Sequence, residues 1–306
     1  MLERLRTWRP TPVVVTRLAL VAIVANSAIV LTGGAVRLTG SGLGCPDWPT
    51  CDGASYVATQ EYGVHGLIEF GNRLLTFALT AVVVALLVAV VRSRPRRGPL
   101  VRLAVLGFLG IPAQGVLGGI TVLTGLNPWT VMLHFLLSCG LIAVSVVTWQ
   151  RSREGDGPVR RLVPAPLATA SYALLAVVGV TLALGTVVTG SGPHSGDPKA
   201  GRTGLDPETV SQLHADLVFV LVGLTVGLLV AFRATGSRGP ARATAVLLAV
   251  ELSQGVVGFV QYWTDLPVLL VALHMLGACL IVVAATRVVL ATRERPAVSP
   301  AVPGPP

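Results

Sequence analysis

The chain has 306 residues, of which 53% are apolar and only 12% are charged, and its mean hydropathy is +0.75. A soluble domain carries about 25% charged residues, so this composition excludes an ordinary soluble protein and indicates an integral membrane protein. The net charge of +9 would suggest nucleic-acid binding in a soluble chain. In a membrane protein, basic residues usually flank the helices on the cytoplasmic side, so we expect no nucleic-acid partner.

Eight apolar runs follow one another along the chain. Each has at least about 20 residues, which covers roughly 30 Å of hydrocarbon. We therefore expect an all-α membrane protein with eight transmembrane helices. The first run lacks a small-residue cleavage site, so we expect a retained helix and not a signal peptide. The runs lie at approximately residues 13–34, 63–91, 100–122, 128–149, 165–188, 208–232, 241–263 and 267–290.

The basic residues are distributed asymmetrically between the links. With eight spans, all but four of the 23 Lys and Arg residues fall on one side of the membrane; the exceptions are Arg37, Arg73, Lys199 and Arg202. This asymmetry predicts that both termini are cytoplasmic. The Pro-rich end, residues 291–306, is predicted to be a disordered cytoplasmic tail.

Two motifs occur twice in the chain. TGSG follows Leu38 and returns after Val188, and QG begins at Gln114 and returns at Gln254. Each half has four helices, so the second half has the same orientation as the first. We therefore predict two parallel four-helix-bundle repeats, residues 1–150 and 151–290, with both TGSG loops facing outward.

Histidines within the helices are the first candidate site residues, because ionisable groups at membrane depth usually mark a site. His134 and His274 occupy equivalent places in the two halves, and His214 lies at a similar depth, roughly 10 Å below the outer surface. One histidine on an apolar helix is more often a hydrogen-bonded core residue than a ligand. Two equivalent ones, each with a partner on another helix, favour a cofactor site. Paired imidazoles suit a six-coordinate heme better than tetrahedral zinc.

The cysteines form two groups. Cys45 and Cys51 lie close together in the first outer loop, where a disulfide is expected, and the spacing leaves a structural and a redox role open. Cys139 and Cys279 each lie five residues after a histidine, about 140° around the helix, so we interpret them as packing residues.

The second helix contains the main difference between the halves. Glu69 and Arg73 are spaced to pair on one helix face, and the second half has no matching acid. We therefore take them as candidate catalytic residues. In one alignment of the halves Asn72 falls at the position equivalent to His214, and in another His65 does. A further acid, Glu251, lies near mid-span in the seventh helix and is expected to pair with a polar neighbour such as Gln254.

Together these features resemble the heme A synthase family. The resemblance rests on "TGSGLGC", "DWPTC", "IEFGNR" and the paired "LH" motifs, and it extends from about residue 13 to 290. It implies that the C8 methyl group of heme O is oxidised to a formyl group by successive hydroxylations. It also implies that heme O and the product heme A bind in the first half, while a heme b binds in the second.

The resemblance also assigns roles to individual residues. Glu69 is implied to be the essential acid, and Cys45 and Cys51 to be the loop disulfide. The heme-iron ligands are implied to be His134, His214 and His274.

The first half departs from the family's helix-two pattern, Glu-x-x-His-Arg, because Asn72 stands at the histidine position. His65, Glu69 and Asn72 share nearly one face of this helix. Asn72 is not an ordinary strong-field ligand, so we expect ligation by His134 alone or weak ligation. His65 is then expected nearer the outer edge of the pocket.

Several alternatives remain open at this level. Glu69 could be a catalytic acid, or it could only pair with Arg73 and tether heme propionates or the helix end. The chain could also be a b-type electron-transfer cytochrome without its own substrate. A transporter fits less well because broken mid-membrane helices are missing.

The family resemblance implies a bacterial plasma-membrane location and heme O as the partner molecule. It also implies heme O synthase and cytochrome oxidase assembly factors as possible protein partners, with an electron acceptor of unknown identity.

Overall fold

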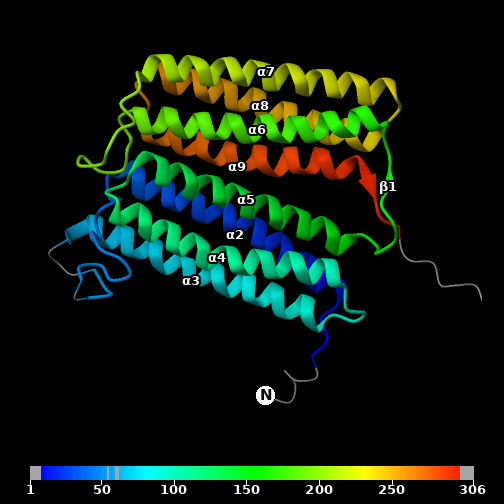
Figure 1. The fold of residues 1–306 in the computed structure, drawn as a ribbon, viewed down its shortest axis with the longest axis horizontal. Coiled ribbons are helices and arrows are strands. Elements are labelled where there is room, and N and C mark those ends of the chain that lie inside the picture. The colour runs from blue at the N-terminus through cyan, green and yellow to red at the C-terminus, as the bar shows by residue number, and fades with distance from the viewer. Residues whose placement is uncertain (1–7, 54, 59–61, 297–306) are drawn as a thin grey trace, which may run out of the picture.

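The computed structural model describes residues 8–53, 55–58 and 62–296. This part of the chain is mainly helical (Figure 1), and eight of its helices are long and apolar enough to cross a membrane. The expected all-helical, multi-pass membrane architecture is therefore confirmed. The helices are α2 (Pro12–Leu38), α3 (Gly63–Arg92), α4 (Gly98–Leu123), α5 (Pro128–Arg153), α6 (Ala165–Ser191), α7 (Pro207–Ala234), α8 (Arg238–Trp263) and α9 (Val268–Ala291).

Local sequence signals account for several helix starts. A proline lies in the first turn of α2, α5 and α7, where its missing N–H costs nothing. The residues just before these prolines are Thr11, Asn127 and Asp206, whose side-chain oxygens accept backbone N–H groups of the first turn. Each of these three helices therefore begins where a capping residue meets an apolar run.

Some helix ends differ from the expected limits. α5 continues to Arg153, so the predicted boundary between residues 150 and 151 falls inside its last turn. α6 continues to Ser191 and includes three residues of the second TGSG motif, which was wrongly expected to be a loop. In that last turn the Ser191 hydroxyl donates to the Val187 carbonyl at 2.9 Å, which satisfies polar groups within the helix.

The helices pack in two groups that meet through α5 and α9 (Figure 1). Between the groups, α5 packs on α6 and α9, and α2 packs on α9. The seam contains an apolar cluster in which Cys139 of α5 and Cys279 of α9 are both buried. The two cysteines are free thiols, so their structural surroundings agree with the packing role expected for them.

The beginning of the C-terminal tail is ordered, contrary to the prediction for residues 291–306. β2 (Arg293–Glu294) pairs antiparallel with β1 (Arg160–Arg161). The backbone N–H groups of Gly155 and Gly157 also donate to the carbonyls of Arg295 and Pro296, both at 3.0 Å. These backbone bonds hold the chain to the α5–α6 link. Residues 297–306 of the predicted tail lie outside the described residues.

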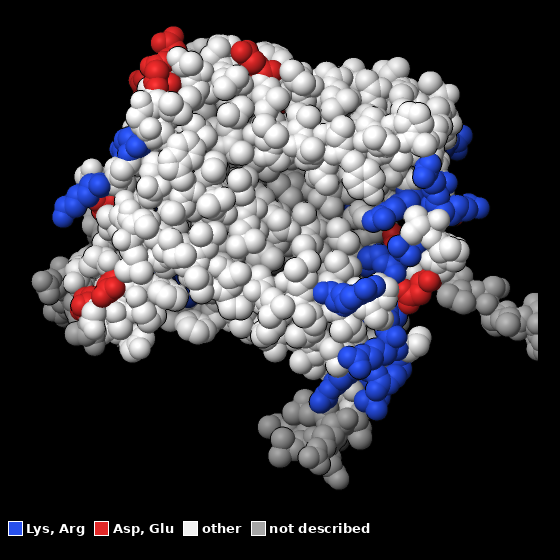
Figure 2. Space-filling view, viewed as in Figure 1, with Lys and Arg blue, Asp and Glu red and all other residues white. Residues whose placement is uncertain are grey.

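Basic side chains crowd one end of the bundle. Figure 2 shows Lys and Arg gathered at the end where β1 lies, and few at the opposite end. At this basic end Arg97 and Arg151 both pair with Asp156, at 2.7 and 2.9 Å. The hydrogen bond from Arg97 is the main reason that the pKa of Asp156 lies below its ordinary value. The links α3–α4 and α5–α6 are thereby joined at this surface.

The opposite end joins the two helix groups through their loops. Arg37, at the end of α2, donates to the carbonyls of His194 and Thr189 at 2.5 and 3.3 Å. The Gly42 N–H donates to the Gly196 carbonyl at 2.9 Å. Both groups therefore contribute to one continuous loop layer above the helices.

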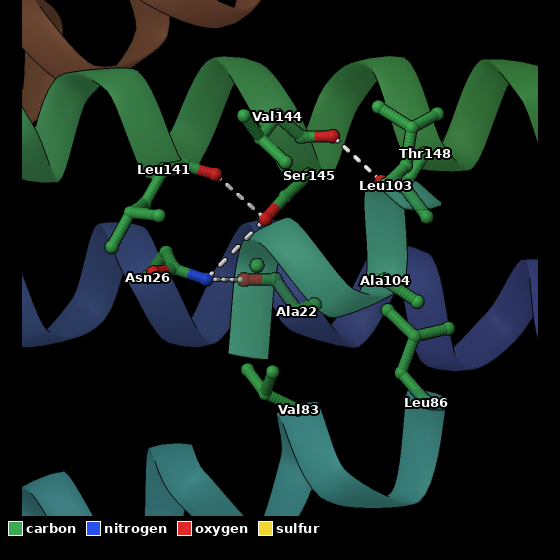
Figure 3. Close-up of a pocket in the computed structure, with 11 residues that line it drawn as sticks. Ala22, Asn26, Val83, Leu86, Leu103, Ala104, Leu141, Val144, Ser145 and Thr148 are labelled. Carbon is green, nitrogen blue, oxygen red and sulfur yellow. Dashed lines mark hydrogen bonds between the residues drawn. The ribbon is translucent and has the colours of Figure 1, made fainter. Parts of the chain in front are cut away.

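A small cavity, lined mostly by apolar side chains together with Asn26, Ser145 and Thr148, lies inside the first group of helices. Its volume is about 10 Å³, roughly room for one water molecule. Figure 3 shows Asn26 Nδ2 donating to the Ala22 carbonyl and to Ser145 Oγ, at 2.8 and 3.4 Å. Thr148 lines the same cavity. Ser145 of this cavity lies about 16 Å along α5 from His134, since it follows that histidine by 11 residues.

Candidate functional site

Two imidazoles project into the second group of helices from α7 and α9. His214 and His274 lie within electrostatic range of each other. Each ring lies against a glycine of a neighbouring helix: a Cβ at Gly185 would lie 3.2 Å from His214 Cε1, and one at Gly258 would lie 3.4 Å from His274 Cε1. The missing side chains leave room for the imidazoles to lie flat against α6 and α8.

The backbone of His134 on α5 and that of His274 on α9 are each held by a glutamine of the preceding helix. Gln254 Nε2 donates to the His274 carbonyl at 2.7 Å, and Gln114 Nε2 donates to the His134 carbonyl at 3.1 Å. A Cβ at Gly118 would lie 3.1 Å from His134 Cε1, which repeats the glycine contact. The QG motif thus supplies both a hydrogen bond and, four residues later, the space for the ring.

The polar atoms of these histidines suit a metal-bound ring. The Nδ1 atoms of His134, His214 and His274 are buried without a hydrogen-bond partner in the described chain. The carbonyl of Thr181 approaches the His214 ring but does not reach hydrogen-bond geometry. No described side chain competes for the Nε2 atoms. Two half-buried imidazoles on α7 and α9, with ring nitrogens that no described residue bonds, are a donor set that fits the iron of a heme.

In the first group, Asn72 occupies the place that a fourth histidine would have. Its Nδ2 lies 3.9 Å from a Cβ built at Gly33 on α2, just as His214 lies beside Gly185 on α6. Asn72 Oδ1 is buried without a hydrogen-bond partner among the described residues. The first pocket thus has one imidazole, from His134, where the second has two.

Glu69 and Arg73 pair as their spacing predicts. Arg73 Nη2 lies 2.6 Å from Glu69 Oε1, and the backbone N–H of Cys45 donates to Glu69 Oε2 at 2.7 Å. The Glu69 residue is only 5% exposed. The carboxylate is therefore held on both oxygens, by Arg73 of the same helix on one side and by the loop that follows α2 on the other.

Arg73 extends this attachment along the loop between α2 and α3. Its guanidinium donates to the backbone carbonyls of Cys45, Asp47 and Thr50, each at 3.0 Å. Cys45 and Cys51 are joined by a disulfide, as predicted for this loop. The guanidinium of Arg73 and the disulfide together thus fix residues 45–51 in a single arrangement.

The disulfide loop covers the first pocket. Trp48 packs on Gly119 of α4, the residue next to the glycine that faces His134. A side chain at Gly119 would overlap the indole. The loop, Glu69 and His134 therefore lie at the same end of the first helix group.

His65 lies at the edge of this arrangement. Its ring is exposed, and Nδ1 lies 2.8 Å from the hydroxyl of Ser41 in the loop that follows α2. It therefore contacts the loop layer, one turn outside Glu69, and no contact joins it to His134 in the described chain. Its role in cofactor binding stays a prediction.

The sequence matches the COX15-CtaA family, described as cytochrome oxidase assembly protein, over residues 16–194. This is more than half of the chain. The chain belongs to this family. The matched region contains Glu69, Asn72, Arg73, His134 and the disulfide, whereas His214 and His274 lie beyond it.

Relatives of known name agree with this membership. The chain is 28% identical over 192 residues to the heme A synthase of Shewanella oneidensis, covering 57% of this chain and 55% of that protein. It is 32% identical over 146 residues to the heme A synthase of Lysinibacillus sphaericus, covering 45% and 46%. The chain therefore spans about half the length of each of these two relatives.

The structure corrects one expected pairing and adds contacts that the sequence did not reveal. Glu251 accepts a hydrogen bond from Thr225 of α7 at 2.9 Å, and not from Gln254, whose amide is used by His274. The glycine beside each pocket residue was also missed. For Gly118 and Gly258 the signal was present in the repeated QGVLGG and QGVVGF motifs.

Proposed function

We propose that this member of the family is a heme A synthase, which oxidises the C8 methyl group of heme O to a formyl group by successive hydroxylations. The observation that carries the proposal is the buried Glu69–Arg73 pair beneath the disulfide loop, beside the single imidazole of His134. The second helix group has no acid at the equivalent place. An enzyme with one reacting site needs a catalytic carboxylate in only one of its two pockets, and this asymmetry fits that requirement.

Glu69 is proposed to act on the reacting methyl group. A carboxylate near that carbon can stabilise developing positive charge or accept a proton. Its two oxygens are oriented by Arg73 and by the Cys45 N–H, so the group is preorganised. Each of two hydroxylations takes two electrons from the carbon, which pass to the required electron acceptor, and the resulting gem-diol loses water to leave the aldehyde. The heme substrate carries the oxidative chemistry, while the protein positions it.

His134 is proposed to bind the substrate iron from α5, with Asn72 opposite it as a weak ligand or none. Trp48 and the Cys45–Cys51 disulfide close the outer end of this pocket. The loop thereby keeps water from the reacting edge. The substrate half corresponds to residues 1–150.

A heme b is proposed in the second half, residues 151–290, held by His214 and His274. When bound, such a heme supplies one-electron transfer to and from the first pocket. The support is the donor set: two half-buried imidazoles, each beside a glycine and each with a buried Nδ1 atom that no described residue bonds. Gln254 fixes the height of His274 by bonding its carbonyl.

The two halves are proposed to be parallel repeats with both termini in the cytoplasm. The repeated Gln–His contacts support equivalent orientation, and the gathering of Lys and Arg at one end supports the sidedness (Figure 2). The bacterial plasma membrane is the proposed location. Heme O synthase and cytochrome oxidase assembly factors are the proposed partners, and an electron acceptor is required.

Pigment extraction tests this function. The chain is expressed in a bacterium that makes heme O but lacks its own heme A synthase, and extracted hemes are separated by chromatography. We expect heme A from the wild type and none from Glu69→Gln, with heme still bound to the purified variant. Glu208→Gln, which changes an exposed carboxyl at the start of α7, is the matched control and should retain activity. Heme b alone in every sample would identify an electron-transfer cytochrome instead.

A second experiment tests the ligands of the second half. His214→Ala and His274→Ala are each expected to lose or convert a low-spin heme signal. An unchanged low-spin spectrum in both variants would refute the assignment.

A further inference from the structure

A carboxyl group outside both pockets lies in the middle of the second helix group. Glu251 is 2% exposed, and its Oε1 accepts the Thr225 hydroxyl at 2.9 Å. Its Oε2 is buried without a hydrogen-bond partner in the described chain. Burying a carboxyl at membrane depth is costly, and such groups usually have a function. The proposed reaction makes no use of this one.

The first half provides an internal comparison. The position 140 residues before Glu251 is Ile111, and the position 142 residues before Thr225 is Val83, by the same offsets that relate the pocket residues. Ile111 and Val83 are buried together in one apolar cluster. The same helix contact is therefore built from an apolar pair in one half and from an acid and a hydroxyl in the other. Packing alone does not require the acid.

Glu251 lies directly below the second pocket. It precedes Gly258, the residue against the His274 ring, by seven residues, which is two helical turns and about 10 Å on the same face. Thr225 follows His214 by 11 residues, three turns along the same face of α7. The pair thus spans the two helices beneath the proposed heme. At this distance in a medium of low polarity, a charge on the carboxyl and a charge on the iron interact strongly.

No other titratable group is bonded to Glu251. The helices that pack on α8 are α7 and α9. Cys279 is buried in the seam with α5, and the two pocket histidines face the pocket. Among described residues, the only hydrogen bond of the carboxyl is the one from Thr225. The other titratable groups on these three helices are Glu208, Asp216, Arg233, Arg238, Arg242, Tyr262 and Arg287.

We propose that Glu251 is a proton-binding site coupled to the redox state of the second pocket. When a heme between His214 and His274 gains an electron from a one-electron reductant, the Glu251 carboxylate binds a proton from the aqueous phase and an O–H bond forms. Reoxidation releases that proton. The added negative charge is thereby neutralised inside the membrane. This inference rests on the proposed heme assignment of the second half.

Redox titration of the purified full-length protein tests the coupling. The midpoint potential of the low-spin heme is measured by absorption at a series of pH values, with redox mediators. In the wild type we expect the potential to fall as pH rises over one range. In Glu251→Gln that dependence should be lost while the low-spin spectrum is unchanged. Ser253→Ala, an exposed hydroxyl two residues away, is the matched control and should titrate as wild type.

Thr225→Val gives a second, signed expectation. The Thr225 hydroxyl stabilises the carboxylate form, so its loss should move the pH-dependent range to higher pH. Infrared difference spectra of reduced minus oxidised protein should show a protonated carboxyl band that is absent from Glu251→Gln. A wild-type pH dependence in Glu251→Gln, or no pH dependence in the wild type, would overturn the inference. Lack of a low-spin heme in the wild type would refute the proposed function, and this inference with it.

Discussion

Gln254 donates a hydrogen bond of 2.7 Å from its side-chain amide to the backbone carbonyl of His274, so a polar residue of α8 sets the height of an imidazole on α9. The same amide fills the space beside Gly277, where a Cβ would overlap it. One glutamine is thereby held between a carbonyl and a glycine. The height of the ring therefore depends on a hydrogen bond to the backbone of His274.

Replacing Gln254 should loosen this pocket without abolishing it. Gln254→Leu removes a hydrogen bond of about 0.5–1.5 kcal/mol, so we expect a partial loss of the low-spin heme band per mole of protein. Gln114→Leu, the matched change beside His134, should leave that band intact. Equal losses in the two variants would contradict the assignment of the band to the second pocket.

The glycine beside His214 should be sensitive to size. A side chain at Gly185 meets the ring, with Cβ 3.2 Å from Cε1, whereas a Cβ at Gly179 on the same helix meets nothing within 4 Å. Gly185→Val should therefore displace the imidazole and lower the heme content, while Gly179→Val should not. Both changes place a β-branched residue in α6, so helix propensity cancels. Absorption at the heme band per protein measures the result.

Arg73 should hold the outer loop. Arg73→Gln leaves Glu69 without its cation and frees three loop carbonyls. Breaking a buried ion pair costs about 3–5 kcal/mol, so we expect faster hydrogen exchange in residues 44–51. Arg73→Lys keeps the charge but cannot reach all three carbonyls. Its exchange rate should therefore lie between those of the wild type and Arg73→Gln. Exchange at the wild-type rate in Arg73→Gln would show that the disulfide alone fixes the loop.

Asn72→His should restore a ligand pair in the first pocket. Asn72 lies beside Gly33 as His214 lies beside Gly185, so the site has room for the ring. We expect an additional low-spin heme signal in electron paramagnetic resonance, because the iron gains a second strong-field ligand. No new signal in a variant that still binds heme would mean that Asn72 does not face the iron.

The four cysteines should separate into two pairs on alkylation. Cys45 and Cys51 are bonded, and Cys139 and Cys279 are free and buried. In denatured, unreduced protein, mass spectrometry should find the alkylating label only on the latter two, and on all four after reduction. Label on Cys45 or Cys51 before reduction would count against the disulfide.

The sequence by itself determined the membrane architecture. Apolar runs of about 20 residues leave the backbone no option in lipid except helices, so the eight spans follow from composition. The spacing of Glu69 and Arg73 also sufficed, because i and i+4 side chains meet on any helix. The disulfide could also be predicted, because Cys45 and Cys51 are only six residues apart and can meet without help from the rest of the fold.

Only the tertiary structure decided which residues meet across helices. The rotation of α7 against α8 brings Thr225, and not Gln254, to Glu251, and no local spacing encodes that angle. The tail is ordered by backbone bonds to a link more than 130 residues earlier, which composition cannot reveal. The glycines Gly118, Gly185 and Gly258 are needed because an imidazole of a neighbouring helix lies against each of them, which the sequence does not show. Contacts within one helix follow from its period, whereas contacts between helices depend on how whole faces pack.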